Sequence, residues 1–323
     1  MNLLLRLCLL FAALSSVPGT TSLAQSSYPS RPIRIVVPFP PGAGTDTIAR
    51  FIAQKLGDAM HTPVVVENKT GAGGAIGAIE VAKAEPDGYT LLFIASPFTT
   101  VAAASRSAGY DPVGQFTPVA SIAAGPLVFV VGKDVPASTM HEFIALARAQ
   151  PGKLNYGSAG TGGINHLALE LLKARTGVDI VHVPYRGIAD ATKDLLSGQI
   201  QAMTASIPAT LPYLADRRVK ALAVTGSKPV GLLPNIPSWQ DAVPNAEVIN
   251  YWGIVAPAGT PHAIVVRLNQ EMQTTLAQPD VQARLAREGV DVMAGSPERL
   301  AALIDGDLAS WKKLIAEAKL TLD

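Results

Sequence analysis

A turn with two glycines has the residue types of an anion-binding site. Gly42 and Gly44 lie between the β-branched run Ile33–Val37 and a segment whose apolar residues fall at helical spacing. Glycine allows close approach of the backbone, so successive N–H groups at the positive end of a helix dipole can converge on a carboxylate or phosphate. An ordinary βα turn without a ligand explains this stretch equally well when it is taken alone.

The residues on either side of this turn predict the strand and the helix that position it. A strand should end at Val37, because Pro38 has no N–H to donate to a sheet. Thr45 or Asp46 then offers a side-chain oxygen to cap the following helix. Asp46 would repel an anion, so we expect it to cap the helix, to order the turn, or to accept a hydrogen bond from a ligand hydroxyl, ammonium group or bridging water.

Strands alternate with helices along the chain, which predicts parallel sheets with right-handed crossovers. The expected strands are 33–37, 63–68, 89–95, 127–131, 153–156, 180–183, 201–205, 219–225 and 252–257, with a loop over 110–126 and a linker over 228–250. Ligands of such sheets lie beyond the carboxyl ends of the strands. In the first half these ends are the turns Phe39–Asp46, Lys69–Gly74 and Ser96–Thr100.

Glycine-rich segments elsewhere have simpler explanations than nucleotide binding. Gly71–Gly77 lacks the spacing of a dinucleotide motif, because Ile76 stands where the last glycine should be. A glycine turn also follows the strand 153–156 and leads into a helix, which repeats the pattern of the first turn. Two α/β lobes with such turns at comparable places predict a hinged protein that closes around a solute.

We expect a discontinuous first lobe. It would contain residues 25–126 and 227–323, because the C-terminal helices should pack back on it, and the second lobe would contain residues 127–226. The helices expected at the end of the chain are 261–276, 281–287 and 297–319.

The residues of the second half offer little support for catalysis or metal binding. His166 stands four residues before Glu170, a spacing used in metal sites, but no third ligand is visible in the sequence. A ring hydrogen-bonded in the cleft or in the core is therefore favoured. Ser158 is not in a nucleophile elbow, because Tyr156 occupies the position two residues before it. We expect no enzyme activity, no metal and no cofactor.

The first residues have the composition of a signal peptide. Met1–Ala24 carries one early Arg6, a leucine-rich apolar run and small residues before Gln25, which predicts export and cleavage near Ala24. Cys8, the one cysteine of the sequence, lies in this segment, so the mature chain has no disulfide and no thiolate ligand. Without Arg6, 25 Lys and Arg balance 25 Asp and Glu. This balance argues against nucleic acid or anionic membranes as partners, and we expect a monomer that does not insert into membranes.

Several motifs together give the chain a family resemblance. They are Tyr28-Pro-Ser-Arg-Pro-Ile-Arg, Pro41-Gly-Ala-Gly-Thr-Asp, Val66–Gly74, Pro86-Asp-Gly-Tyr, Tyr110-Asp-Pro-Val, Phe116-Thr-Pro-Val, Ser158-Ala-Gly-Thr with His166, and Val183-Pro-Tyr-Arg-Gly. Over its mature length the chain resembles the exported solute receptors of tripartite tricarboxylate transporters, the Bug or TctC family. The resemblance implies a type II periplasmic binding protein fold with two lobes, each a mostly parallel sheet flanked by helices. It also implies a small carboxylate ligand, which is citrate-like, dicarboxylic, an amino acid or aromatic.

The resemblance further implies which residues bind the ligand. They are Phe39, Gly42, Ala43, Gly44, Thr45, Asp46 and Ser96 from the first lobe, and Ser158, Gly160, Thr161, His166 and, on the hinge side, Tyr185 from the second. Family members often have Gly in place of Ala43 and more polar residues in place of Pro97 and Phe98, so the pocket of this chain should be altered. Packing in the core, without a role in ligand binding, would also explain Tyr185.

The sequence therefore predicts an exported, non-catalytic receptor. It would capture a small organic carboxylate in the cleft between the lobes and deliver it to the membrane permease subunits of a tripartite transporter. The alternative is a ligand-dependent extracytoplasmic partner of a sensor kinase, with the same cleft and a different client.

Overall fold

The computed structural model describes residues 28–42, 44–105, 108–318 and 320. The predicted signal peptide and Cys8 lie outside the described residues. The following account concerns the unit Arg31–Asp323.

The first strand group begins with three parallel strands. β1 (Ile33–Val37) pairs with β2 (Val64–Asn68) and β3 (Thr90–Ala95), with Ile35 opposite Val66 and Leu91. The connecting helices are α2 (Gly44–Met60), α3 (Ala75–Ala82), which follows the short 3₁₀ helix η1 (Ala72–Gly74), and α4 (Pro97–Ala104). Four of the five residues of β1 are apolar and buried, as expected where helices cover both faces of a parallel sheet. The predicted alternation of parallel strands and helices is confirmed here.

β4 (Phe116–Gly132) is a 17-residue strand that belongs to both halves of the sheet. The strand order is β2-β1-β3-β9-β4-β7-β5-β6, with β8 and β10 also paired to β4. The prediction of a loop over 110–126 is therefore wrong from Phe116 onward, since residues 116–126 pair antiparallel with β9 (Ile249–Pro257). Register shifts near residues 118–123 interrupt the alternation of side chains, which hid this strand from pattern analysis.

The second strand group is built from β5 (Asn155–Ser158), β6 (Val181–Pro184), β7 (Ala202–Ser206) and β8 (Val219–Val224). β5 runs parallel to β6 and β7, whereas β7 and β8 run antiparallel to β4. The helices here are α5 (Met140–Ala149), α6 (Ile164–Thr176), α7 (Ile188–Ser197) and α8 (Ile207–Ala215). The sequence did not predict α8, because prolines at 208 and 212 obscure its helical pattern.

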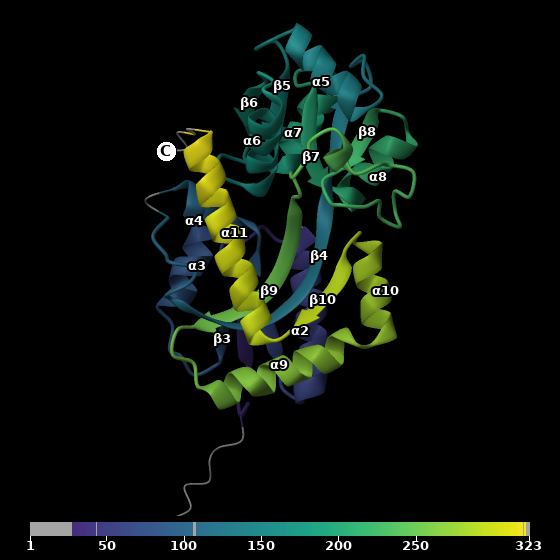
Figure 1. The fold of residues 1–323 in the computed structure, drawn as a ribbon. Helices are drawn as coiled ribbons and strands as arrows, with labels where there is room; N and C mark the ends of the chain where they lie inside the picture. The colour runs from purple at the N-terminus through teal and green to yellow at the C-terminus, as the bar shows by residue number, and fades with distance from the viewer. Residues whose placement is uncertain (1–27, 43, 106–107, 319, 321–323) are drawn as a thin grey trace, which may run out of the picture. The chain divides into compact units, whose positions relative to one another are not determined.

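The C-terminal segment adds α9 (His262–Leu276), α10 (Pro279–Arg287), β10 (Asp291–Gly295) and α11 (Pro297–Glu317). The helices were predicted, but β10 was not. The expected linker over 228–250 contains the short 3₁₀ helix η2 (Trp239–Asp241) and the start of β9. In Figure 1, α11 runs alongside β4 and β9 from the first strand group toward the second.

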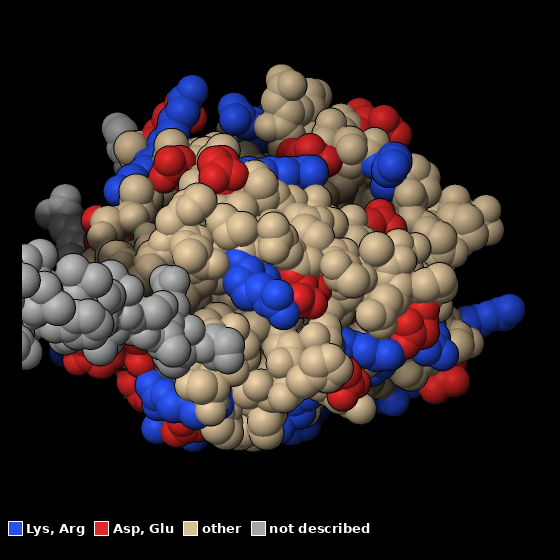
Figure 2. Space-filling model, turned by 90° about the horizontal axis from the view of Figure 1, so that it is seen from below, with Lys and Arg blue, Asp and Glu red and all other residues tan. Residues whose placement is uncertain are grey.

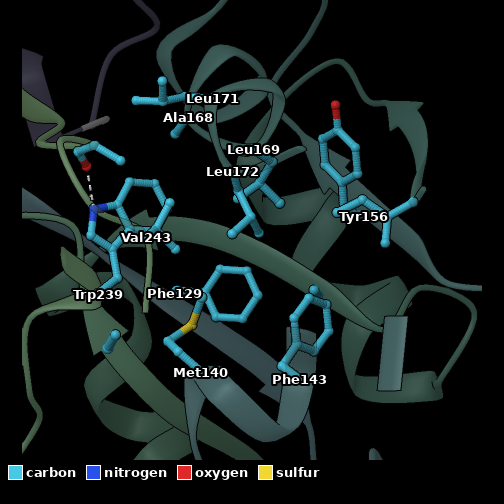
Figure 3. Packing of buried hydrophobic residues seen from close by; sticks show 14 of the residues in the cluster. Phe129, Met140, Phe143, Tyr156, Ala168, Leu169, Leu171, Leu172, Trp239 and Val243 are labelled. Carbon is cyan, nitrogen blue, oxygen red and sulfur yellow. Dashed lines mark hydrogen bonds between the residues drawn. The ribbon is translucent and has the colours of Figure 1, made fainter. Parts of the chain in front are cut away.

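Two hydrophobic clusters share α11. Its Leu300 and Ile304 pack in the cluster around β1, β3 and β9, whereas Trp311 and Leu314 join the cluster around β4, α5 and α6. Figure 3 shows the second cluster, in which the indole N–H of Trp239 donates to the Ala246 carbonyl. Residues 239–248 thus pack against the second strand group. The boundaries of the two lobes remain a prediction.

Positive and negative side chains are interspersed on the face shown in Figure 2. Lys55 on α2 and Asp280 on α10 form an ion pair with an N–O distance of 2.5 Å. Among the described residues, no helix is both long and apolar enough to cross a membrane.

Candidate functional site

The first glycine turn is held in place by the buried carboxylate of Asp46. Its Oδ2 accepts hydrogen bonds from the Gly42 N–H at 2.8 Å and from Arg50 Nε at 3.0 Å, while Oδ1 accepts from Asn68 Nδ2 at 2.7 Å. The same Asn68 nitrogen donates to the carbonyl of Phe39 at 2.9 Å. Burial acts to raise the pKa of Asp46, but the hydrogen bonds from Arg50, Asn68 and Gly42 outweigh it and lower the pKa. The carboxylate is therefore ionised and orders the turn.

The capping prediction needs correction. α2 already begins at Gly44, so neither Thr45 nor Asp46 precedes the helix as a cap. Asp46 instead reaches back from the first helical turn to the Gly42 N–H. Thr45 Oγ1 accepts a hydrogen bond of 3.1 Å from the indole N–H of Trp252, which ties the turn to β9.

The backbone of this turn is open to a ligand. Gly42 and Gly44 are exposed, and a Cβ added to either would meet no atom within 4 Å. Gly42 has a φ of 79°, which favours glycine. Ala43, the remaining residue predicted for this turn, lies outside the described residues.

Ser96 has a structural role in this conformation. Its side chain is buried, donates to the Ile249 carbonyl at 3.3 Å and accepts from the Tyr251 N–H at 3.0 Å. The hydroxyl therefore joins the end of β3 to β9. The predicted turn over Ser96–Thr100 is also wrong beyond its first residue, because α4 begins at Pro97.

In the second strand group, the side chain of Ser158 makes hydrogen bonds within its own turn. Its hydroxyl lies 2.7 Å from His182 Nε2, donates to the Gly160 carbonyl and accepts from the Gly160 N–H, both at 3.1 Å. Ser158 is fully buried, Gly160 has a φ of 124°, and Thr161 is exposed. His182 is a partner that the sequence did not reveal.

His166 is a buried ring within the fold. Its Nδ1 accepts from the Gly162 N–H at 3.1 Å, and its ring stacks on His182 with 3.8 Å between ring centroids. Burial lowers the pKa of both imidazoles to about 4. The charge of Lys173 helps at His166, and the charge that His166 gains when it is protonated helps at His182. Both rings are therefore neutral at pH 7.

Glu170 completes this buried group, but the geometry does not suit a metal. Its Oε1 accepts from the Tyr156 hydroxyl at 2.6 Å and from Lys173 Nζ at 2.7 Å, and lies 3.9 Å from His166 Nε2. Burial and the Glu170 charge raise the pKa of Tyr156, which remains a hydrogen-bond donor. No cluster of three or more metal-ligating side chains is found in the part of the chain that the structure describes.

The hydroxyl of Tyr185 makes a hydrogen bond to a neighbouring helix. The hydroxyl donates to Asp194 Oδ2 on α7 at 2.7 Å, and the residue is half-buried. Burial and the bond to Asp194 raise its pKa to about 12. In this conformation the tyrosine braces α7 against the end of β6.

A cavity of about 340 Å³ lies beside the first turn. Its lining residues come from the first turn and α2, the middle of β4, the start of α8, β9 and the residues after α10: Gly42, Gly44, Thr47, Ile48, Pro126, Leu127, Ser206, Ile207, Pro208, Ala209, Asn250, Trp252, Glu288, Gly289 and Val290. The structure thus brings the first turn together with the start of α8. Ser158, Gly160, Thr161, His166 and Tyr185 are not among the residues that line this cavity.

The sequence did not identify the start of α8 as part of a site. Ser206 followed by Pro208 in the first helical turn is a typical helix start, and this signal could have found it. A larger hollow of about 530 Å³, lined by residues of α6 and α11 and by residues 240–247, contains neither glycine turn.

Comparisons with known proteins agree with the predicted fold and family. A family model described as "Tripartite tricarboxylate transporter family receptor" matches residues 48–320. Protein BugT of Bordetella pertussis is 32% identical over 320 residues, which are 98% of each chain.

Two solved structures of similar proteins contain carboxylates. Rpa4515 of R. palustris, solved with adipate, has 34% identity and a TM-score of 0.82 over 90% of this chain and 98% of that one. MatC from Rhodopseudomonas palustris, solved with bound malate, has 32% identity and a TM-score of 0.80 over 89% of this chain and 100% of that one. These matches confirm the predicted α/β fold of periplasmic binding proteins.

Proposed function

Since the chain belongs to the tripartite tricarboxylate transporter receptor family, we propose that it is an exported receptor that captures a small organic carboxylate and delivers it to the permease subunits of such a transporter. The family is one of receptors and not of enzymes, which confirms the prediction that the chain is not an enzyme. One observation carries the proposal: exposed glycines at the start of α2 line a cavity of about 340 Å³.

The start of α2 can hold a carboxylate without a basic side chain at the ligand. The first N–H groups of a helix have no helical acceptor, and the helix dipole favours negative charge there. The Gly42 N–H is already taken by Asp46, so among the described residues of the turn the next backbone donor is Gly44. Thr45 Oγ1 accepts from Trp252 and keeps its own proton, which it can donate to a ligand oxygen.

The negative charge of Asp46 is compensated within the turn. Both of its oxygens accept hydrogen bonds, and Arg50 places a positive charge 3.0 Å from Oδ2. A ligand carboxylate therefore meets backbone donors whose position is fixed by an ion pair behind them.

Support for the ligand class comes from the relatives that bind adipate and malate. Support for export comes from the composition of residues 1–24, and the permease partner follows from the family description. We place the receptor in the periplasm, as a two-lobed protein that closes over its ligand.

The proposal is tested by ligand binding to the mature chain. Calorimetric titration with mono- and dicarboxylates should give saturable binding, and a ligand at about 100 times its dissociation constant should add roughly 2.7 kcal/mol to the free energy of unfolding. Gly44→Asp should lower the affinity at least about tenfold, because the new carboxylate occupies open space at the anion position.

Gly187→Asp is the matched control. Gly187 also lies at the start of a helix, since it directly precedes α7, whereas Gly44 is the first residue of α2. A Cβ at Gly187 meets nothing within 4 Å, and the residue does not line the cavity. Unchanged affinity in Gly44→Asp, or an equal loss in Gly187→Asp, would refute the site assignment.

A further inference from the structure

The walls of the cavity beside the first turn are mostly apolar. They include Ile48, Pro126, Leu127, Ile207, Pro208, Ala209, Trp252 and Val290. The polar side chains in the lining are Thr47, Ser206 and Asn250, which are neutral. Most of the ligand surface in this cavity therefore contacts hydrocarbon or aromatic groups.

The charged side chain that lines the cavity is acidic. Glu288 is the charged residue among the described lining residues, which include no Lys, Arg or His. Its carboxylate pairs with Arg284 at 2.5 Å, one turn earlier on α10, and Arg284 does not line the cavity. A ligand with negative charge at both ends would place one end at the start of α2 and the other near Glu288 or against apolar walls.

The start of α8 is a weaker anion site than the start of α2. Pro208 lies in its first turn and has no N–H to donate. Asn250 uses Oδ1 to accept from the Ser96 N–H, which leaves its amide N–H groups as neutral donors. These groups suit a hydroxyl or carbonyl oxygen better than a second carboxylate, whose desolvation they would not offset.

We propose that the ligand is a monocarboxylate with an uncharged, largely apolar body, because the described lining residues offer no cation to a second carboxylate. This inference rests on the proposed function. The carboxylate binds at the start of α2, and the body of the ligand packs between Trp252, Leu127 and Ile207. This chain thereby differs from the relatives solved with adipate and malate, which are dicarboxylates.

The test compares acids of equal length. Hexanoate and adipate have six carbons each, and 4-methylbenzoate and terephthalate have eight each. In each pair a carboxylate replaces one methyl group, and calorimetric titration of the mature chain measures the affinities. At least one monocarboxylate should bind about tenfold or more tightly than its dicarboxylate, because a second carboxylate would lose its hydration among apolar walls whose described residues include no cation to offset the cost. Tighter or equal binding of both dicarboxylates overturns the inference.

Glu288→Lys tests the missing positive charge. The variant should raise the affinity for adipate or terephthalate about tenfold and change monocarboxylate affinity much less, since it gives the described lining the cation that it lacks. Glu271→Lys is a closely matched control, because Glu271 also pairs with an arginine four residues earlier and has a side chain 19% exposed, against 18% for Glu288. A gain in Glu271→Lys equal to that in Glu288→Lys also overturns the inference.

These results separate the two proposals. If dicarboxylates bind more tightly and Gly44→Asp abolishes their binding, the carboxylate receptor stands and the monocarboxylate inference fails. If none of the four acids binds, both fail.

Discussion

Acid should destabilise this protein through the stacked imidazoles of His166 and His182. Burial lowers the pKa of each from 6.5 to about 4. Between these values the unfolded chain binds a proton that the native state does not, so the free energy of unfolding rises with pH in this window. The stabilisation is present above pH 6.5 and is lost as the pH falls toward 4.

The size of the effect follows from the two pKa values. At pH 5 an unfolded imidazole is almost fully protonated, whereas a native one with a pKa of about 4 is about one-tenth protonated. One ring should therefore lower the free energy of unfolding at pH 5, relative to pH 7, by roughly 1 to 2 kcal/mol, where the lower figure allows for partial solvent exposure of His182.

A variant isolates this contribution from other titrating groups. His182→Gln removes one proton-binding ring and keeps a side-chain amide for the hydroxyl of Ser158, which lies 2.7 Å from His182 Nε2. Its loss of stability between pH 7 and pH 5 should be smaller than that of the wild-type chain by roughly 1 to 2 kcal/mol. The measurement is urea unfolding at the two pH values, followed by circular dichroism.

The control is His141→Gln, because His141 is exposed on α5. It should lose as much stability between the two pH values as the wild-type chain. If His182→Gln also does so, the buried rings do not carry the acid sensitivity and the argument from burial is refuted.

Three further predictions concern other contacts. Burial raises the pKa of Asp307 to about 6, so its native carboxyl holds a proton that the unfolded chain releases, and the contribution of Asp307 to stability falls as the pH rises from 4 to 6. Relative to the wild-type chain, Asp307→Asn should therefore gain thermal stability over this range, and a constant difference between the two midpoints would contradict this. Asn68→Ala removes hydrogen bonds to Asp46 and to the Phe39 carbonyl, so the free energy of unfolding in urea should fall by about 1 to 3 kcal/mol and carboxylate binding should weaken. An unchanged urea midpoint would contradict the role of Asn68. Gly306→Ala should stabilise α11 by about 0.5 to 1 kcal/mol, because a Cβ there meets nothing within 4 Å; a lower thermal midpoint would contradict this.

Local signals were enough to predict the first turn and its neighbours. The run Ile33–Val37 forms β1 within those bounds, and the helix after Gly44 shows the expected apolar spacing. These features depend on side-chain periodicity and on residues close in sequence, so they are visible without a structure. The family motifs were equally local and correctly indicated the fold.

Elements with weak local signals were missed. Register shifts mask the first part of β4, and Pro208 and Pro212 mask α8. β10 forms because its backbone can pair with β4, which lies far away in the chain. In each case sheet pairing or packing prevails over intrinsic propensity.

The sequence by itself determined the alternation of strands and helices, the glycine turn at 42–44 and the family. The tertiary structure decided which groups meet: Trp252 donates to Thr45 from 207 residues away, and His182 binds the hydroxyl of Ser158 from 24 residues away. It also placed the start of α8, and not the turn at Ser158, on the cavity beside Gly44. The physical reason is that backbone conformation follows local propensity, whereas side-chain partners depend on how distant strands pair and pack.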